Sequence, residues 1–358
     1  MIKSYAPGRA ELLGNHTDYN GGLVLSIAVE RGILVSGEVR TNSEILIYAR
    51  ELRQTYEGSL DRLEPSTEKP WANYLLGVFD EFRKRGLALG GVDLTIQSDL
   101  PPGAGLSSSA ALETATAFFL RHAFGHGASL DNLEMARIGQ AAEHRYAGVK
   151  CGLLDQISSI YGKAGHATFI DCRSFEVKNI PLPDDLRFVI ANSGVKHALV
   201  NGEYNERRES CEAAAHALGV HNLREVDSAT LERLAGKLSP AALKRARHVV
   251  GEIERVSAGV EALIQGDAKD FGELMFTSHR SSIENFENSC PELDRLVEVA
   301  RTVPGCLGAR LSGGGFGGAT INLVEPGREA ALVEALEKAL PGTTCLVTKA
   351  ANGAHVEA

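Results

Sequence analysis

The sequence predicts an α+β protein in which strands and helices are mixed along the chain. Short runs rich in β-branched and apolar residues predict strands, mostly in the first half. Longer stretches with apolar residues at helical spacing dominate the second half. The regular alternation of strands and helices that would indicate a doubly wound parallel sheet is missing, and this favours the α+β class.

The length and charge of the chain narrow the classes of function. A chain of 358 residues is long enough for about two domains. Hydrophobic residues make up 44% and charged residues 23%, which is ordinary for a protein with buried cores. The formal net charge of -9 and the lack of a Lys/Arg run argue against a nucleic-acid partner. Anionic ligands stay open, because backbone N–H groups can hold a phosphate.

Cysteine usage and hydropathy predict the compartment. None of the six cysteines is in a C-x-x-C pair, so neither a zinc site nor a dithiol redox motif is indicated. The first residues lack the apolar core of a signal peptide, and no apolar run is long enough to span a membrane. We therefore expect a reduced, cytoplasmic protein with no membrane partner.

The first half is predicted to begin with an extended segment that enters a glycine-rich loop over residues 7–22. Strands are then predicted over residues 23–29, 32–39, 44–49 and 92–97. Helices are predicted over residues 71–84 and 130–146, and directly after a glycine- and serine-rich loop at 101–111.

In the second half, two predicted strands at residues 167–171 and 187–191 flank a turn, and we place the domain boundary there. The expected domains are residues 1–178 and 179–358. The helices expected after the boundary cover residues 203–218, 241–265, 268–278, 291–303 and 328–340. Further strands are expected at 308–311, 320–324 and 344–348.

The loop at residues 101–111, PPGAGLSSSAA, carries the most chemistry. It lacks the GK[ST] ending of a Walker A loop and the G-x-G-x-x-G spacing of a dinucleotide site. Gly103 and Gly105 would still let the backbone approach a ligand, and the free N–H groups of the following helix would favour a phosphate. Three consecutive serines could cap the helix, bind phosphate oxygens or ligate Mg²⁺. A glycine turn with a serine cap is the simpler alternative, but one serine would suffice for it.

The segment at residues 8–22 concentrates hydrogen-bonding side chains. Such a density suits a ligand with many hydroxyl groups, since each hydroxyl can both donate and accept. A solvated surface loop is the alternative, and the leucines around the segment argue against full exposure. For the side chain of His16, a structural histidine with satisfied nitrogens is the favoured interpretation. The polar residues concerned are Arg9, Glu11, Asn15, His16, Asp18 and Asn20.

Asp155 lies among apolar neighbours in KCGLLDQ, so its carboxylate must be paired or functional. Arg9 is its natural partner if the two segments converge, and a helix-capping aspartate is the alternative. A second glycine-rich segment, at 312–318, has five glycines in seven positions. It can approach another chain segment or a phosphate closely, or form a simple hairpin.

The three segments, in this order, resemble the three signature motifs of the GHMP kinases. GRAELLGNHTDYNGG resembles the sugar-binding motif of the galactokinase family, LPPGAGLSSSAA the nucleotide loop, and LSGGGFGGATINLV the third motif. Weaker segments such as WANYLLGV and AAEHRYAGVKCGLLDQ agree, so that the likeness covers nearly the whole chain.

The resemblance implies a two-domain GHMP kinase fold. Its N-terminal domain would be ribosomal-S5-like, its C-terminal domain ferredoxin-like, and the active site would lie in the cleft between them. It also implies transfer of a phosphoryl group from ATP, with Mg²⁺, to the anomeric C1 hydroxyl of galactose. A monomer is expected.

The resemblance also implies roles for single residues. Asp155 and Arg9 match the catalytic pair. Ser109 and Glu143 match the groups around Mg²⁺. The residues that match sugar contacts are Asn15, His16, Asp18, Gly152 and Tyr204. The residues that match the nucleotide loop are Gly103, Gly105, Leu106, Ser107, Ser108, Ser109 and Ala110.

Two positions depart from the family motif, which usually has Asn where this chain has Glu11 and Glu where it has Asn15. Asn15 matches a contact near the C6 hydroxyl of the sugar, and its amide would remove a repulsion toward a C6 carboxylate. Glu11, four residues earlier, could restore the charge. A kinase for a C6-modified sugar such as galacturonate is therefore one alternative. A non-catalytic galactose sensor of the same fold is another.

Overall fold

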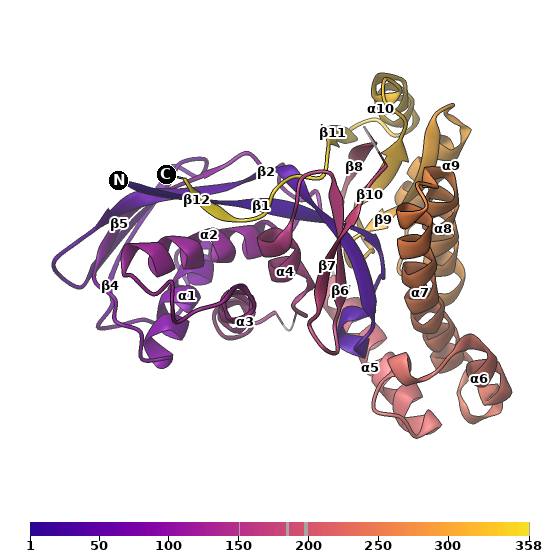
Figure 1. The fold of residues 1–358 in the computed structure, drawn as a ribbon, viewed down its shortest axis with the longest axis horizontal. Coiled ribbons are helices and arrows are strands. Elements are labelled where there is room, and N and C mark those ends of the chain that lie inside the picture. The colour runs from indigo at the N-terminus through magenta and orange to yellow at the C-terminus, as the bar shows by residue number, and fades with distance from the viewer. Residues whose placement is uncertain (150, 184–185, 197–199, 358) are drawn as a thin grey trace.

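The structure is a computed structural model that describes all residues except 150, 184–185, 197–199 and 358. Within the described residues, the chain forms one sheet of eight strands and one of four, each covered by helices. Figure 1 shows the first sheet with its helices on one side of the molecule and the second sheet with the long C-terminal helices on the other. This is the two-domain arrangement expected from the sequence.

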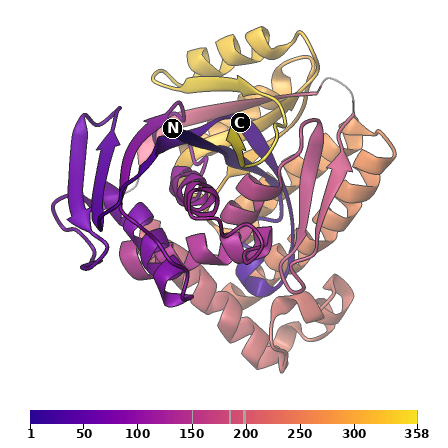
Figure 2. The same ribbon diagram turned by 60° about the vertical axis from the view of Figure 1, so that its left-hand side comes forward.

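The first sheet has the order β12-β1-β2-β5-β3-β4, and β6 joins it by pairing with both β2 and β7. All pairs are antiparallel except β3 with β5. Its strands are β1 (Ile2–Leu13), β2 (Leu23–Val39), β3 (Glu44–Ala49), β4 (Gln54–Ser59), β5 (Val92–Ser98), β6 (His166–Asp171), β7 (Val177–Pro181) and β12 (His355–Glu357). The helices of this half are α1 (Asn73–Lys84), α2 (Ser108–Ala123), α3 (Asn132–Ala142) and α4 (Leu154–Tyr161). Figure 2 shows α2 running beneath β1 and β2.

The prediction of a loop over residues 7–22 was wrong for its first half, because β1 continues to Leu13. Nearly all of β1 is buried, so it lacks the alternation that marks a half-exposed strand. Gly8 is a packing requirement within this strand, since a Cβ there would lie 2.8 Å from the carbonyl oxygen of Leu106. Arg9 and Glu11 therefore lie on a rigid strand, and the loop is limited to residues 14–22.

Two strands were predicted over residues 23–29 and 32–39, whereas β2 is one strand of 17 residues. The predicted break marks a change of partner. Residues 23–26 pair with β6, and residues 33–39 pair with β5. The exposed pair Glu30 and Arg31 lies between these two regions.

The second sheet has the order β11-β8-β10-β9 and is antiparallel throughout. Its strands are β8 (Arg187–Lys196), β9 (Cys306–Ser312), β10 (Gly317–Val324) and β11 (Thr344–Thr348). The helices of this half are α5 (Val200–Leu218), α6 (Ser228–Arg233), α7 (Pro240–Ile264), α8 (Ala268–Ser281), α9 (Pro291–Thr302) and α10 (Glu329–Ala339). The long helices predicted here are confirmed to within a few residues.

Several departures from the predicted elements bear on the site. The helix predicted over residues 130–146 ends at Ala142, and a π-helical turn, Glu143–Ala147, follows it. The short elements β4, β7, β12, α4 and α6 were not predicted.

The chain passes between the sheets after β7, and β12 returns to pair with β1. We keep the boundary near residue 178 as a proposal. In the described part of the chain, no helix is long and apolar enough to cross a membrane.

Candidate active site

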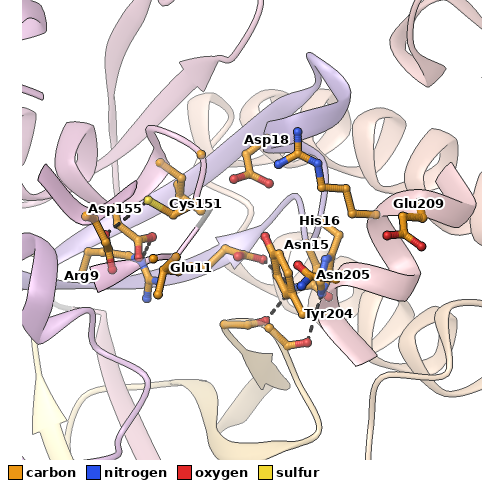
Figure 3. A pocket seen from close by; sticks show the side chains of 18 of the residues that line it. Arg9, Glu11, Asn15, His16, Asp18, Cys151, Asp155, Tyr204, Asn205 and Glu209 are labelled. Carbon is orange, nitrogen blue, oxygen red and sulfur yellow. Dashed lines mark hydrogen bonds and ion pairs between the residues drawn. The ribbon is translucent and has the colours of Figure 1, made fainter. Parts of the chain in front are cut away.

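A cavity of about 550 Å³ opens between β1, the segment before α4, the first turns of α5 and the loop joining β9 to β10. All five residues expected to contact a sugar line it, together with Arg9, Glu143 and Asp155. Figure 3 shows these side chains converging from segments far apart in the sequence. The polar segment at residues 8–22 is thus a cavity wall, and the alternative of a solvated surface loop is wrong.

Arg9 and Asp155 meet at this wall. The Nε of Arg9 donates to Oδ1 of Asp155 across 2.7 Å, and the hydroxyl of Ser107 donates to Oδ2 across 2.5 Å. Asp155 lies in the first turn of α4, where Leu153 is the N-cap residue. Both carboxylate oxygens are engaged by these two partners, so the alternative of a helix-capping aspartate is wrong.

Arg9 also ties the strand to the serine loop. Its Nη1 donates to the carbonyl oxygen of Gly105 across 2.7 Å, and its backbone N–H donates to the carbonyl of Leu106. Burial alone would lower the pKa of Arg9, but the carboxylate of Asp155, with those of Glu11 and Asp18, outweighs burial and raises it. The guanidinium is therefore a fixed positive charge between the loop and Asp155.

The serine loop precedes α2, as predicted, but lies beside the cavity and does not line it. Gly103 and Gly105 have φ values of 74° and 67°, which side chains rarely adopt. Ser107 is the N-cap residue but makes no capping bond, because its hydroxyl is directed to Asp155. The idea that this serine caps the helix was wrong. The free N–H groups of α2 remain directed toward the loop.

Glu143 begins the π-helical turn after α3, and its carboxylate lies close to that of Asp155. Burial, followed by the charge of Asp155, raises the pKa of Glu143, while a hydrogen bond from Ser109 opposes the rise. The thiol of Cys151 donates to Glu143 Oε2 across 3.3 Å, and the amide of Gln156 donates to the same oxygen across 3.2 Å. Ser109 and Glu143 are therefore neighbours, although they come from different helices.

These two side chains fit a magnesium ion that shares its coordination with a nucleotide. Mg²⁺ prefers oxygen ligands, keeps several waters and takes phosphate oxygens alongside one or two carboxylates. One hydroxyl and one carboxylate suit that pattern. Among the described residues, no group of three or more His, Cys, Asp or Glu side chains could hold a metal ion, so the protein alone offers only part of a shell.

Asp18 and Gly152 are packed together in the cavity wall. A Cβ at position 152 would lie 2.1 Å from Oδ2 of Asp18, so that only glycine leaves room for this carboxylate. Burial, with a smaller contribution from the charge of Glu11, raises the pKa of Asp18 to about 6, although a hydrogen bond from the backbone N–H of Tyr19 opposes the shift. Asp18 is thus an acceptor whose ionisation falls within an accessible pH range.

His16 is confirmed as a histidine with both nitrogens satisfied. Its Nε2 lies 3.0 Å from the carbonyl oxygen of Gly314, which can only accept, so Nε2 carries the proton and Nδ1 accepts from the hydroxyl of Tyr19. Burial lowers its pKa to about 4. Its ring packs against that of Tyr204 at a centroid distance of 5.0 Å. His16 thereby supports Tyr204, which lines the cavity.

The residues that hold the loop in place could not be identified from the sequence. Glu252, fully buried on α7, accepts the backbone N–H groups of Gly14 and Asn15 across 2.9 and 3.0 Å. Arg255 pairs with Glu252 across 2.6 Å. Burial alone would raise the pKa of Glu252, but the charge and hydrogen bond of Arg255, together with the other cationic groups nearby, outweigh burial and lower it. In the sequence, Glu252 and Arg255 form a charged pair at helical spacing, a pattern that is common on solvated helices and does not indicate a site.

The segment at 312–318 is a hairpin, since it joins β9 to β10, and it also approaches another chain segment. The carbonyls of Gly313 and Gly314 accept from Asn15 and His16. A Cβ at Gly315 would lie 2.1 Å from the carbonyl oxygen of Asn288. Both sequence interpretations therefore hold, apart from contact with a phosphate, which stays a prediction.

Three family models match the chain. The model of the GHMP kinase N-terminal domain matches residues 73–163, and that of the C-terminal domain matches residues 260–342. A model described as a galactokinase galactose-binding signature matches residues 3–39, which include β1 and the loop of the cavity wall.

Curated relatives are similar over almost the full chain. Galactokinases of Homo sapiens and Bos taurus are each 43% identical over 98% of this chain and 91% of their own length. A galactokinase of Chloroflexus aggregans is 43% identical over 89% of this chain and 83% of its own. A crystal structure of Lactococcus lactis galactokinase complexed with galactose superposes with a TM-score of 0.93 at 30% identity, covering 99% of this chain and 94% of that one.

Proposed function

The chain belongs to the galactokinase family of the GHMP kinases, and we propose on that premise how its residues transfer a phosphoryl group from ATP to galactose. The reaction joins the anomeric O1 of galactose to the γ-phosphorus of ATP and breaks the bond to the bridging oxygen of ADP. The products are galactose 1-phosphate and ADP.

The observation that carries the assignment of roles is the arrangement of Asp155 at the cavity wall. Its carboxylate is fixed at one oxygen by Arg9 and at the other by Ser107, and the cavity beside it is lined with hydrogen-bonding groups. A sugar hydroxyl that enters beside Asp155 can donate to it. In this proposal Asp155 orients the C1 hydroxyl and accepts its proton as the new bond to phosphorus forms.

Arg9 supplies the positive charge. Phosphoryl transfer passes through a loose transition state, so positioning and charge stabilisation matter more than covalent chemistry. The guanidinium contacts both Asp155 and the carbonyl of Gly105, and this places it between the proposed base and the proposed phosphate loop. It is positioned to stabilise negative charge that develops on the transferring group.

The nucleotide and magnesium sites are finer parts of the proposal. The N–H groups at the start of α2, with residues 103–110, would receive the phosphates of ATP. Ser109 and Glu143 would hold Mg²⁺ together with phosphate oxygens. When bound, this ion would neutralise phosphate charge. We further propose that the protein is a cytoplasmic monomer with no nucleic-acid or membrane partner, which size-exclusion chromatography and cell fractionation would test.

Release of ADP in the presence of galactose and Mg-ATP tests the activity and excludes a non-catalytic sensor. The Asp155→Asn variant tests the role of the carboxylate, since the two side chains have nearly the same shape. Turnover should fall by about two to four orders of magnitude, with ATP and sugar binding retained in calorimetry. Near-normal turnover of a folded Asp155→Asn variant would refute the assignment of Asp155.

A further inference from the structure

The two positions that depart from the family motif, Glu11 and Asn15, lie side by side in the cavity wall. The side-chain nitrogen Nδ2 of Asn15 donates to Oε1 of Glu11 across 3.3 Å and to the carbonyl of Gly313 across 2.8 Å. Oδ1 of Asn15 accepts from Asn288 across 3.0 Å. Both amide hydrogens of Asn15 are thus engaged within the chain. Although Asn15 lines the cavity, it has no free donor to offer a ligand.

Glu11 is held differently. Its Oε1 accepts from Nη1 of Arg310 across 2.9 Å, and both residues are buried, with Arg310 0% exposed. Arg310 comes from β9 of the second sheet, and its Nε and Nη2 find no hydrogen-bond partner in the described chain. An arginine cannot lose its charge in a protein, so a buried one requires an anionic partner. Among the described residues, Arg310 forms its ion pair with Glu11.

The second oxygen of Glu11 is directed differently from the first. Oε1 carries both contacts described above, whereas Oε2 accepts from no described residue and is not sealed from the cavity. The chain therefore keeps one carboxylate oxygen of Glu11 fixed and leaves the other available at the cavity surface. An available acceptor on an anchored carboxylate is what a sugar hydroxyl requires.

The position of Glu11 on β1 indicates which part of a sugar it would meet. Arg9 and Glu11 are two residues apart on one strand, so they point to the same face at a separation of about 7 Å. Arg9 holds Asp155, beside which the anomeric hydroxyl is proposed to lie. A hexose ring that spans this separation would bring its opposite end, the C4 hydroxyl and the C6 group, to Glu11.

We propose that Glu11, anchored by Arg310, is the specificity-determining residue of the sugar site and restricts the substrate to sugars that are neutral at the C4–C6 end. This proposal rests on the proposed sugar kinase function. The free oxygen of Glu11 accepts a hydrogen bond from a hydroxyl there and repels a carboxylate. Asn15 acts as a structural clip between Glu11 and the loop at 313–314.

The overall charge of the cavity agrees with this selection. Six carboxylate side chains line it, against two arginines, and an anionic sugar would meet a field of the same sign. The carboxylates are those of Glu11, Asp18, Glu143, Asp155, Glu209 and Glu212.

The test compares two ligands that differ mainly in charge, galacturonate and its neutral amide, galacturonamide. Their binding is measured by calorimetry, and ADP release is measured separately with galactose. The wild type should bind galacturonamide at least about tenfold better than galacturonate. Glu11→Gln should reduce this preference by about tenfold or more, because it removes the charge and keeps the shape. Equal binding of the two ligands by the wild type would overturn the proposal.

Glu252→Gln is the matched control. Glu252 is likewise a buried carboxylate paired with an arginine and attached to the same loop, but it does not line the cavity. The control should keep the preference within about twofold of the wild type. If the preference for galacturonamide changed equally in both variants, or did not change in Glu11→Gln, Glu11 would not determine the selectivity of the sugar site.

Folding failure and failure of the general function are separated by two further measurements. If Glu11→Gln does not fold, Glu11→Asp replaces it, since it keeps the charge and withdraws the carboxylate by one methylene. The preference for galacturonamide over galacturonate should then fall in Glu11→Asp and persist in Glu252→Asp. A preference that persists in Glu11→Asp and falls in Glu252→Asp would overturn the proposal. Absence of ADP release with galactose in the wild type would refute the kinase function itself, whatever the ligand preference.

Discussion

The hydroxyl of Ser107 donates to Oδ2 of Asp155 at 2.5 Å and thereby connects the serine loop to the proposed catalytic carboxylate. Ser107 has a φ of 51°, a conformation that is uncommon for a residue with a side chain. The backbone strain is consistent with a position held for this contact. Any movement of the serine loop would therefore lengthen or break this hydrogen bond and shift the carboxylate of Asp155.

Removal of that hydroxyl should reduce turnover more than it reduces binding. We expect Ser107→Ala to lower kcat about tenfold to a hundredfold, because a hydrogen bond to a charged group is worth about 1.5–3 kcal/mol. Steady-state kinetics with galactose measure this. In an Asp155→Asn background the same substitution should have little further effect. A full additional loss there would mean that Ser107 acts independently of Asp155.

Gly152→Ala should weaken sugar binding by about tenfold or more and leave ATP binding unchanged. The new methyl group would lie 2.1 Å from Oδ2 of Asp18 and must displace that carboxylate from the cavity wall. Calorimetry with each ligand separately measures the two affinities. Gly202→Ala on α5 is the control, because nothing lies within 4 Å of its new methyl group. Unaltered sugar affinity in a folded Gly152→Ala would exclude Asp18 as a sugar contact.

Sugar binding should weaken as the pH falls through about 6. Asp18, whose pKa is raised to about 6 chiefly by burial, is charged above this pH and accepts hydrogen bonds from the sugar in that form. Protonation below pH 6 removes one acceptor, so the KM for galactose should rise. The KM of Asp18→Asn should be high and flat across the same range. A profile in Asp18→Asn that still bends near pH 6 would assign the titration to another group.

Stability should fall in acid for a different reason. Burial lowers the pKa of His16 to about 4 and that of His248 to about 3, so both are neutral in the folded protein at pH 5, whereas an unfolded histidine titrates near 6.5. The unfolded state binds more protons below about pH 6.5, so the free energy of unfolding is full above that pH and is lost as the pH falls toward 4. The raised pKa values of the buried carboxyl groups of Asp18, Glu113 and Glu143 act in the opposite sense. The contribution of a histidine is therefore isolated by comparing the wild type with a histidine variant.

Urea unfolding at pH 7 and pH 5 measures the effect. The two histidines together are expected to contribute a loss of the order of a few kcal/mol. His248→Gln should show a smaller loss, since it removes one of the two histidines and lies outside the cavity. A loss of the same size in this variant would contradict the role of His248.

The sequence predicted the α+β class, the long helices and the meeting of Arg9 with Asp155, because each depends on local pattern or on the resemblance of a motif. It failed where tertiary contacts decide. Residues 7–13 of β1 were predicted as part of a loop because burial on both faces removes the alternation that identifies a strand. Glu252, Asn288 and Arg310 gave no signal, since each acts through contacts with residues more than 200 positions away.

Asn15 illustrates a subtler difference between pattern and structure. From the motif alone, Asn15 was expected to contact the sugar near its C6 hydroxyl. The structure directs both amide hydrogens to Gly313 and Glu11. Whether a side chain in a cavity wall is available to a ligand depends on every neighbour that competes for it. Here those neighbours come from β1 and from the loop that joins β9 to β10.

The pairing of β12 with β1 has a consequence for the order of synthesis. Residues 355–357 complete the edge of a sheet whose first strand begins at Ile2, with Lys3 opposite Glu357. The ribosome must therefore synthesise residues 355–357 before the start of β1 acquires this neighbour. Until then residues 3–5 of β1 have an open edge, and such edges are prone to pair with other chains. The first residues of the strand that carries Arg9 are thus shielded from aggregation only late in translation.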